Sequence, residues 1–142
     1  MSVMRMSVIA AALSVAYAGP LFAADNAARD QMRADRDRIQ ADAKAARDGC
    51  KSMKGNERQV CMAEAKGVER VAKAELEAKQ NDTPRNRQKV AEAKADADYG
   101  VAKEKCDDMK GKEKNQCEKD AKAARDQARK AAKGEGDAAK KG

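Results

Sequence analysis

The chain has 142 residues and a formal net charge of +7; 39% of its residues are charged and only 2% are aromatic. Beyond residue 23, Leu, Ile, Val and Phe together number seven, too few for a conventional core of large side chains. The sequence also contains no His, the usual general base and the commonest metal ligand. We therefore expect no enzyme, no bound cofactor and no dedicated metal site.

Residues 1–23 have the pattern of a secretory signal peptide. Arg5 precedes an apolar run over 6–17 that is too short to span a bilayer as a helix. Small residues place the cleavage site after Ala23, with Ala18 as the second choice. The sequence therefore predicts a protein exported to the periplasm.

The next feature along the chain is a cysteine frame that occurs twice. Ten residues separate Cys50 from Cys61, ten separate Cys106 from Cys117, and both copies carry Met, Lys, Gly and Glu at the same places between the cysteines. The offset between the copies is constant (106 − 50 = 56 and 117 − 61 = 56), which indicates an internal duplication. The predicted units are a first helical hairpin over 24–81, a second over 82–133 and a flexible basic tail over 134–142.

Four cysteines in a small exported chain predict two disulfides, for which three connectivities exist. Gly55 and Gly111 lie midway between the cysteines of each copy, and a turn there would bring the two cysteines opposite each other across an antiparallel helix pair. This favours the local pairs Cys50–Cys61 and Cys106–Cys117. Pairing between the copies is the alternative, because residues eleven apart lie on nearly the same face of a continuous helix.

The rest of the pattern predicts an all-α fold: two tandem disulfide-stapled helical hairpins in an elongated, Ala-rich four-helix arrangement. Between the hairpins, Asp82 or Thr83 can cap a helix that has Pro84 at its first position. Heptad spacing read outward from each cysteine predicts one apolar seam per helix. The seams comprise Met32, Ile39, Ala43, Ala46, Cys50 and Met53; Cys61, Ala65, Val68 and Ala72; Ala95, Tyr99, Ala102, Cys106 and Met109; and Cys117, Ala121, Ala124, Ala128 and Ala131.

The positive charge is concentrated at two places. Arg85, Arg87 and Lys89 cluster beside the Pro84 turn, and the segment 119–141 is rich in Lys and Ala. Each is either a solvated surface or a candidate site for anionic lipid or lipopolysaccharide phosphates. Nucleic acid is not expected as a natural partner, because the chain is exported and has too few aromatic residues for base stacking.

The run from Val90 to Tyr99, VAEAKADADY, and its continuation VAKEKCDD from Val101 to Asp108 resemble small exported proteins of Gram-negative bacteria described as TolA-like or cell-envelope biogenesis proteins. The duplicated cysteine frame belongs to the same resemblance, which extends over about 30–133. It implies an exported helical protein of the cell envelope and assigns no functional residue.

These observations lead to two hypotheses about function. The first is a non-enzymatic periplasmic structural or interaction protein, with a role in envelope stress, whose helices contact envelope components, periplasmic proteins or further copies of the chain. The alternative is a chaperone-like module or a module that binds metal or anionic ligands. For metal, the equivalent Met53 and Met109 are the soft ligands available, although apolar packing is the commoner role of Met at helical spacing.

Overall fold

The computed structural model describes residues 21–141, which form four helices and no strand. The helices are α1 (Leu21–Cys50), α2 (Gly55–Gln80), α3 (Pro84–Cys106) and α4 (Gly111–Lys141). The predicted all-α fold is confirmed. The predicted signal peptide lies outside the described residues except for 21–23, which form the first turn of α1.

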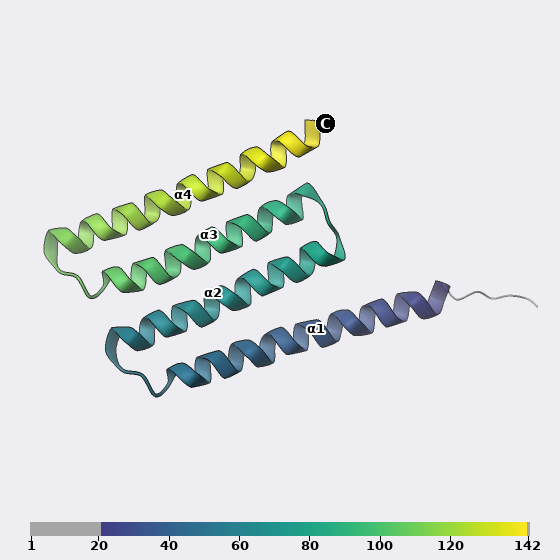
Figure 1. Ribbon diagram of the computed structural model, residues 1–142, viewed down its shortest axis with the longest axis horizontal. Helices are drawn as coiled ribbons and strands as arrows, with labels where there is room; N and C mark the ends of the chain where they lie inside the picture. The colour runs from purple at the N-terminus through teal and green to yellow at the C-terminus, as the bar shows by residue number, and fades with distance from the viewer. Residues whose placement is uncertain (1–20, 142) are drawn as a thin grey trace, which may run out of the picture.

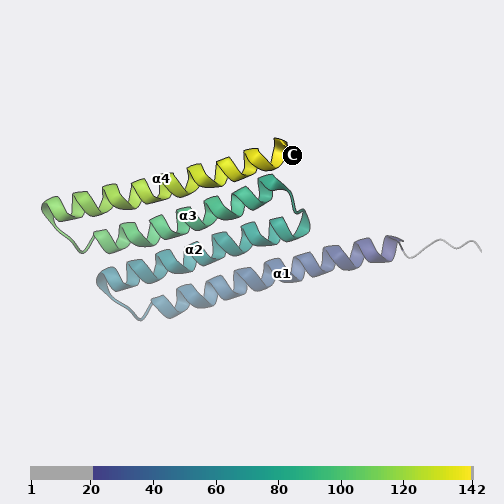
Figure 2. The ribbon, with the colours of Figure 1, turned by 45° about the horizontal axis from the view of Figure 1, so that its top comes forward.

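The four helices lie side by side in a single layer (Figure 1). Contacts join α1 to α2, α2 to α3 and α3 to α4, and no other pair of helices is in contact within 21–141. The rotated view shows the same order without any helix crossing over another (Figure 2). The molecule is therefore a single layer of antiparallel helices with two broad faces, and α1 and α4 form its edges.

Both disulfides are local. Cys50 pairs with Cys61 across the α1–α2 turn, and Cys106 pairs with Cys117 across the α3–α4 turn, with Cα atoms 5.7 Å and 5.6 Å apart. The preferred connectivity is confirmed and pairing between the copies is excluded. Because α1–α2 and α3–α4 turn at the same end of the layer, both disulfides tie that end.

The two turn glycines adopt the left-handed conformation, with φ of 57° at Gly55 and 58° at Gly111. A glycine in this conformation commonly follows the end of a helix. Each glycine begins the second helix of its hairpin, whereas the first helix ends earlier, at Cys50 or Cys106. A side chain at this φ would be strained, so the turn depends on Gly in both copies.

The α2–α3 turn follows the predicted capping pattern. Pro84 occupies the first turn of α3, and the Thr83 hydroxyl accepts a hydrogen bond from the backbone N–H of Asn86 at 3.1 Å. The Asn86 side chain is buried and donates to the carbonyl of Asn81 at 2.8 Å. These bonds close the turn between the two repeats.

The core is thin and consists mostly of Ala and Cys. Cys50 and Cys106 are fully buried, and the other buried apolar residues are Ala43, Ala65, Leu76, Ala93, Ala95 and Ala132. The expectation of one seam per helix is wrong for α2 and α3, because an inner helix packs along both of its flanks. Val68, placed on the α2 seam, is 70% exposed for this reason.

The C-terminal segment also differs from expectation. Helix α4 continues through the predicted flexible tail as far as Lys141. Ala132 and Gly136 are buried, whereas Ala124, Ala128 and Ala131 of the expected seam are exposed. A Cβ at Gly136 would lie 2.7 Å from the carboxamide oxygen of Gln88 on α3, at the end of a flexible side chain that can move aside.

Candidate functional site

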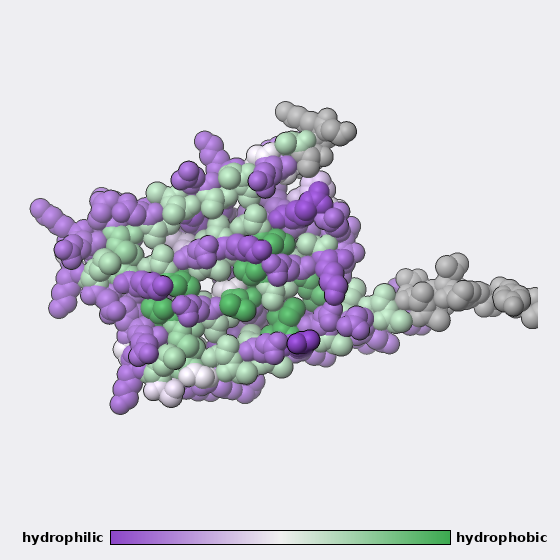
Figure 3. All heavy atoms as spheres, in the orientation of Figure 1, coloured by the Kyte–Doolittle hydropathy of each residue, from purple (hydrophilic) through white to green (hydrophobic). Residues whose placement is uncertain are grey.

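The most distinctive surface is an apolar groove of about 730 Å³ between α2 and α3. It lies on the face turned to the viewer in Figure 3, where hydrophobic residues gather over the middle of these helices. Small and β-branched residues form its floor and walls, and charged residues form its rim. Its lining comprises Glu64, Gly67, Val68, Val71, Ala72, Glu75, Lys94, Ala97, Asp98, Val101, Ala102 and Lys105.

A close approach of the two inner helices sets the depth of the groove. A Cβ atom built on Gly67 would lie 2.9 Å from the Cβ of Ala97, closer than real carbon atoms pack. Glycine therefore allows α2 and α3 to touch at this point, and the side chains on either side stand above the contact. Val68 contributes most to the exposed wall.

The rim carries opposite charges on opposite helices. Glu75 on α2 and Lys94 on α3 form an ion pair of 3.0 Å across the groove. Glu64 precedes Glu75 by eleven residues and Lys105 follows Lys94 by eleven, which is about three helical turns on each antiparallel helix. Acidic residues thus mark the α2 side at both rungs and basic residues mark the α3 side, where Asp98 adds one acidic group between the two lysines.

The other face of the same seam is polar. A smaller depression there is lined by Gln59, Lys66, Arg70, Asp96 and Glu104, besides the small residues of the seam. Arg70 and Asp96 lie 3.9 Å apart across it, and Asp96 is 3.6 Å from Arg129 of α4. The two faces of the layer are therefore chemically different at their centre.

Ion pairs reinforce the α1–α2 hairpin. Asp48 accepts from Lys44 at 2.7 Å and lies 2.7 Å from Lys51, and hydrogen bonds from these two ammonium groups lower the pKa of Asp48 to about 2. Across the hairpin, Glu69 contacts Arg47 of α1 and Lys73 of its own helix. Hydrogen bonds from Lys73 and then Arg47 hold the pKa of the Glu69 carboxyl below its usual value.

Helix α4 is attached to α3 by a different set of contacts. The Arg125 guanidinium lies over the Tyr99 ring, 4.4 Å from its centroid. At the disulfide end, Lys114 pairs with Asp107 at 2.7 Å, and this hydrogen bond lowers the pKa of Asp107. Aromatic and charged side chains therefore join α3 to α4 here.

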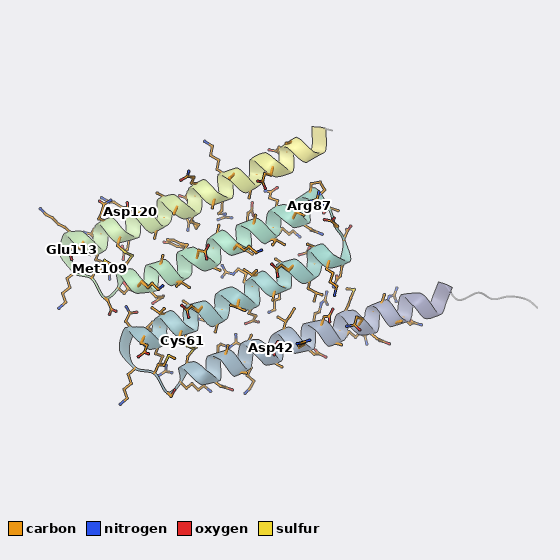
Figure 4. The ribbon with its side chains drawn as sticks, in the orientation of Figure 1. Asp42, Cys61, Arg87, Met109, Glu113 and Asp120 are labelled. Carbon is orange, nitrogen blue, oxygen red and sulfur yellow. A yellow bond between two sulfur atoms is a disulfide. The ribbon has the colours of Figure 1, made fainter. Side chains whose placement is uncertain are left out.

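The predicted anion-binding cluster is brought together only in part. Arg87 pairs with Asp82, and Lys89 pairs with Glu77. Arg85 is exposed, and Figure 4 places Arg87 at the α2–α3 end of the layer, far from Met109 and Cys61. Two of the three cations therefore already have carboxylate partners, which weakens their availability to an external anion.

The soft ligands considered for metal do not meet. Met53 is half-buried in the α1–α2 turn and Met109 is exposed in the α3–α4 turn. In the part of the chain that the structure describes, no group of three or more His, Cys, Asp or Glu residues is arranged to hold a metal ion.

Sequence reasoning missed the groove. Its signals were present: α2 has Val68 and Val71 where the duplicate helix has Ala124 and Gln127. Helix α4 therefore lacks the large apolar side chains that α2 presents at the α2–α3 seam.

The two disulfides indicate an oxidising, extracytoplasmic compartment. Among residues 21–141, no helix combines the length and the apolar character needed to span a membrane. Comparisons with protein families, with characterised proteins and with solved structures find no match to this chain.

Proposed function

We propose that this protein is a non-enzymatic structural or interaction protein of the cell envelope, exported to the periplasm after cleavage of the signal peptide over 1–23. The observation that carries the proposal is the single layer of helices. A layer held by disulfides and small residues presents two broad surfaces of different chemistry, and it buries little of itself. Such a molecule is suited to contact rather than to enclosing a substrate.

The two surfaces have separate roles in this proposal. On the polar face Arg70 already lies 3.9 Å from Asp96, whereas Lys66 is exposed and forms no ion pair among the described residues. Lys66 therefore suits contact with envelope components that carry negative charge. The apolar groove suits a protein surface. The disulfides keep both hairpins in place in an oxidising compartment, where the layer must persist without a large core.

The first test is fractionation of producing cells, followed by intact-mass measurement. The proposal expects protein released from the periplasm to begin at or near Ala24 and to contain no alkylatable thiol before reduction. Protein that keeps residues 1–23, or that carries four reactive thiols, would contradict export and oxidation.

The second test uses a photoreactive residue placed at Lys66 on the polar face or at Val68 in the groove. Covalent adducts with envelope proteins or lipids from position 66 are expected in living cells, with Ala45 on the outer edge of the layer as the control position. If position 66 gives no envelope adduct, the proposed envelope contact is wrong, whatever position 68 captures.

A further inference from the structure

The groove is an unpartnered apolar surface at the centre of the layer. Stable domains usually pack two layers of secondary structure around a core, whereas here Val68 is 70% exposed and its neighbours Val71 and Val101 are half-buried. Three valines of the seven large aliphatic residues beyond residue 23 thus gather on one face. Something other than the described chain would have to cover them.

The internal duplication places charged residues on the outer helices at positions where the inner helices have small ones. Small residues line the α2–α3 seam at Ala63 and Gly100. Their counterparts 56 positions away are Lys119 on α4 and Lys44 on α1, and both lysines are exposed. The outer helices therefore carry bulky charges where the inner helices carry small residues, as in the polar caps of repeat proteins. Lys44 lines a depression between α1 and α2, so these charges cover part of a broad face and leave the valine groove as the apolar surface.

We propose that a second copy of this chain covers the groove face, giving a two-layer dimer whose two-fold axis runs along the groove. This inference goes beyond the proposed function, because it concerns the chain alone and needs no envelope component.

The charges on the rim select this axis. Rotation about an axis along the groove places α2 of one copy over α3 of the other at the same height. Glu64 and Glu75 then lie over the ends of Lys105 and Lys94, with the axial offset that the Glu75–Lys94 pair already bridges within one chain. An axis perpendicular to the helices would instead place α2 over α2, with Glu64 facing Glu75. Only the first arrangement pairs opposite charges.

The same rotation brings apolar side chains together between the charged rungs. The Gly67–Ala97 contact fixes the relative heights of α2 and α3, so Val68 of each copy lies over Ala97 and Asp98 of the other, and Val101 lies about 7 Å farther along the groove. Asp98 is the unfavourable neighbour in this arrangement, since it comes to lie over Val68. Glu64, Asp98 and Lys105 form no ion pair within the described chain, so their charges are available to this interface.

The area of the face is adequate for a dimer. Helices of this length extend about 35–39 Å, and two neighbours with axes about 8–10 Å apart cover a face of about 700 Å². Specific interfaces bury about 800 Å² per partner, and the flanks of α1 and α4 would supply the remainder.

The test is sedimentation equilibrium of the purified, oxidised protein, with Val68→Asp and Ala45→Asp as a matched pair. Both positions are exposed and helical, but only Val68 lies in the groove. Wild-type protein and the Ala45→Asp variant are expected to be dimeric at micromolar concentrations. Val68→Asp should weaken dimerisation about a hundredfold or more, because each dimer buries two carboxylates against apolar side chains, and its circular dichroism should match that of the wild type.

Charge reversals test the direction of the axis. Glu64→Lys should weaken the dimer about tenfold, and adding Lys105→Glu should restore it. Asp98→Asn should tighten it. A monomeric wild-type protein would overturn the proposal, even if that monomer bound an unfolded protein or a lipid in the groove. Tighter association of the Glu64→Lys variant would also overturn it.

Discussion

The contact between Gly67 and Ala97 determines how closely the two repeats approach. With a hydrogen in place of a side chain, Gly67 allows the backbones of α2 and α3 to come together where any larger residue would hold them apart. This gain in proximity offsets the entropic cost of glycine inside a helix. Gly100 on α3 is different, because a Cβ there would meet nothing within 4 Å.

Substitution of these two glycines should have opposite effects. Gly67→Leu is expected to destabilise the fold by about 1–3 kcal/mol, because the new side chain forces α2 and α3 apart. Gly100→Ala should stabilise it by about 0.5–1 kcal/mol through helix propensity alone. Chemical unfolding followed by circular dichroism measures both. Equal effects of the two changes would mean that the α2–α3 approach is looser than described.

The ionisation of Asp48 makes the stability of the C-terminal end of α1 depend on pH. Its folded-state pKa is lowered to about 2 by Lys44 and Lys51, whereas an unfolded Asp titrates near pH 4. The stabilisation is therefore present above about pH 4 and is lost as the pH falls toward 2. We expect thermal stability to decline over this window, and the decline to be smaller in an Asp48→Asn variant. An identical acid response of the two proteins would show that Asp48 does not contribute.

The two helical hairpins carry equivalent disulfides but differ in how well their outer helices pack at the opposite end. The disulfides hold one end of each hairpin. At the far end, α4 is anchored by buried Ala132 and Gly136, whereas residues 26–31 of α1 are all exposed. Helix α1 therefore depends more on its disulfide than α4 does.

Reduction should lower the melting temperature while leaving considerable helix at low temperature, because helix propensity survives the loss of the tether. Each disulfide is expected to contribute about 3 kcal/mol. Replacing Cys50 and Cys61 together by Ser should cost more than the same change at Cys106 and Cys117. Circular dichroism melts of the two double variants decide this, and a greater loss in the second hairpin would contradict the difference in anchoring.

Local signals in the sequence were sufficient for the helices, the staples and the turns. The pairing of Cys50 with Cys61 follows from Gly55 between them, and the Thr83 cap with Pro84 defines the start of α3. The sequence does not predict as well which helices pack against one another. Heptad spacing predicts one apolar stripe, but it does not say how many helices a helix touches, so it places Val68 on a seam and does not predict the groove.

The single-layer arrangement follows from the small number of large apolar side chains in the chain. Four helices that meet through Ala, Gly and Cys can form close pairwise contacts, but they offer too little volume to fill the centre of a compact bundle. A single layer of helices encloses no central volume that large side chains would have to fill. It leaves an apolar face exposed to solvent, and the dimer interface proposed for the groove would bury that face.

The distance between the two edge helices tests the single layer most directly. Spin labels at Ala45 on α1 and Gln127 on α4, two exposed positions, can be measured by double electron–electron resonance. Dilution with unlabelled protein removes distances between copies. Three interhelical spacings predict a backbone separation of about 24–30 Å, whereas a closed four-helix bundle would place α1 beside α4, about 8–10 Å away. A population at the shorter distance would contradict the layer.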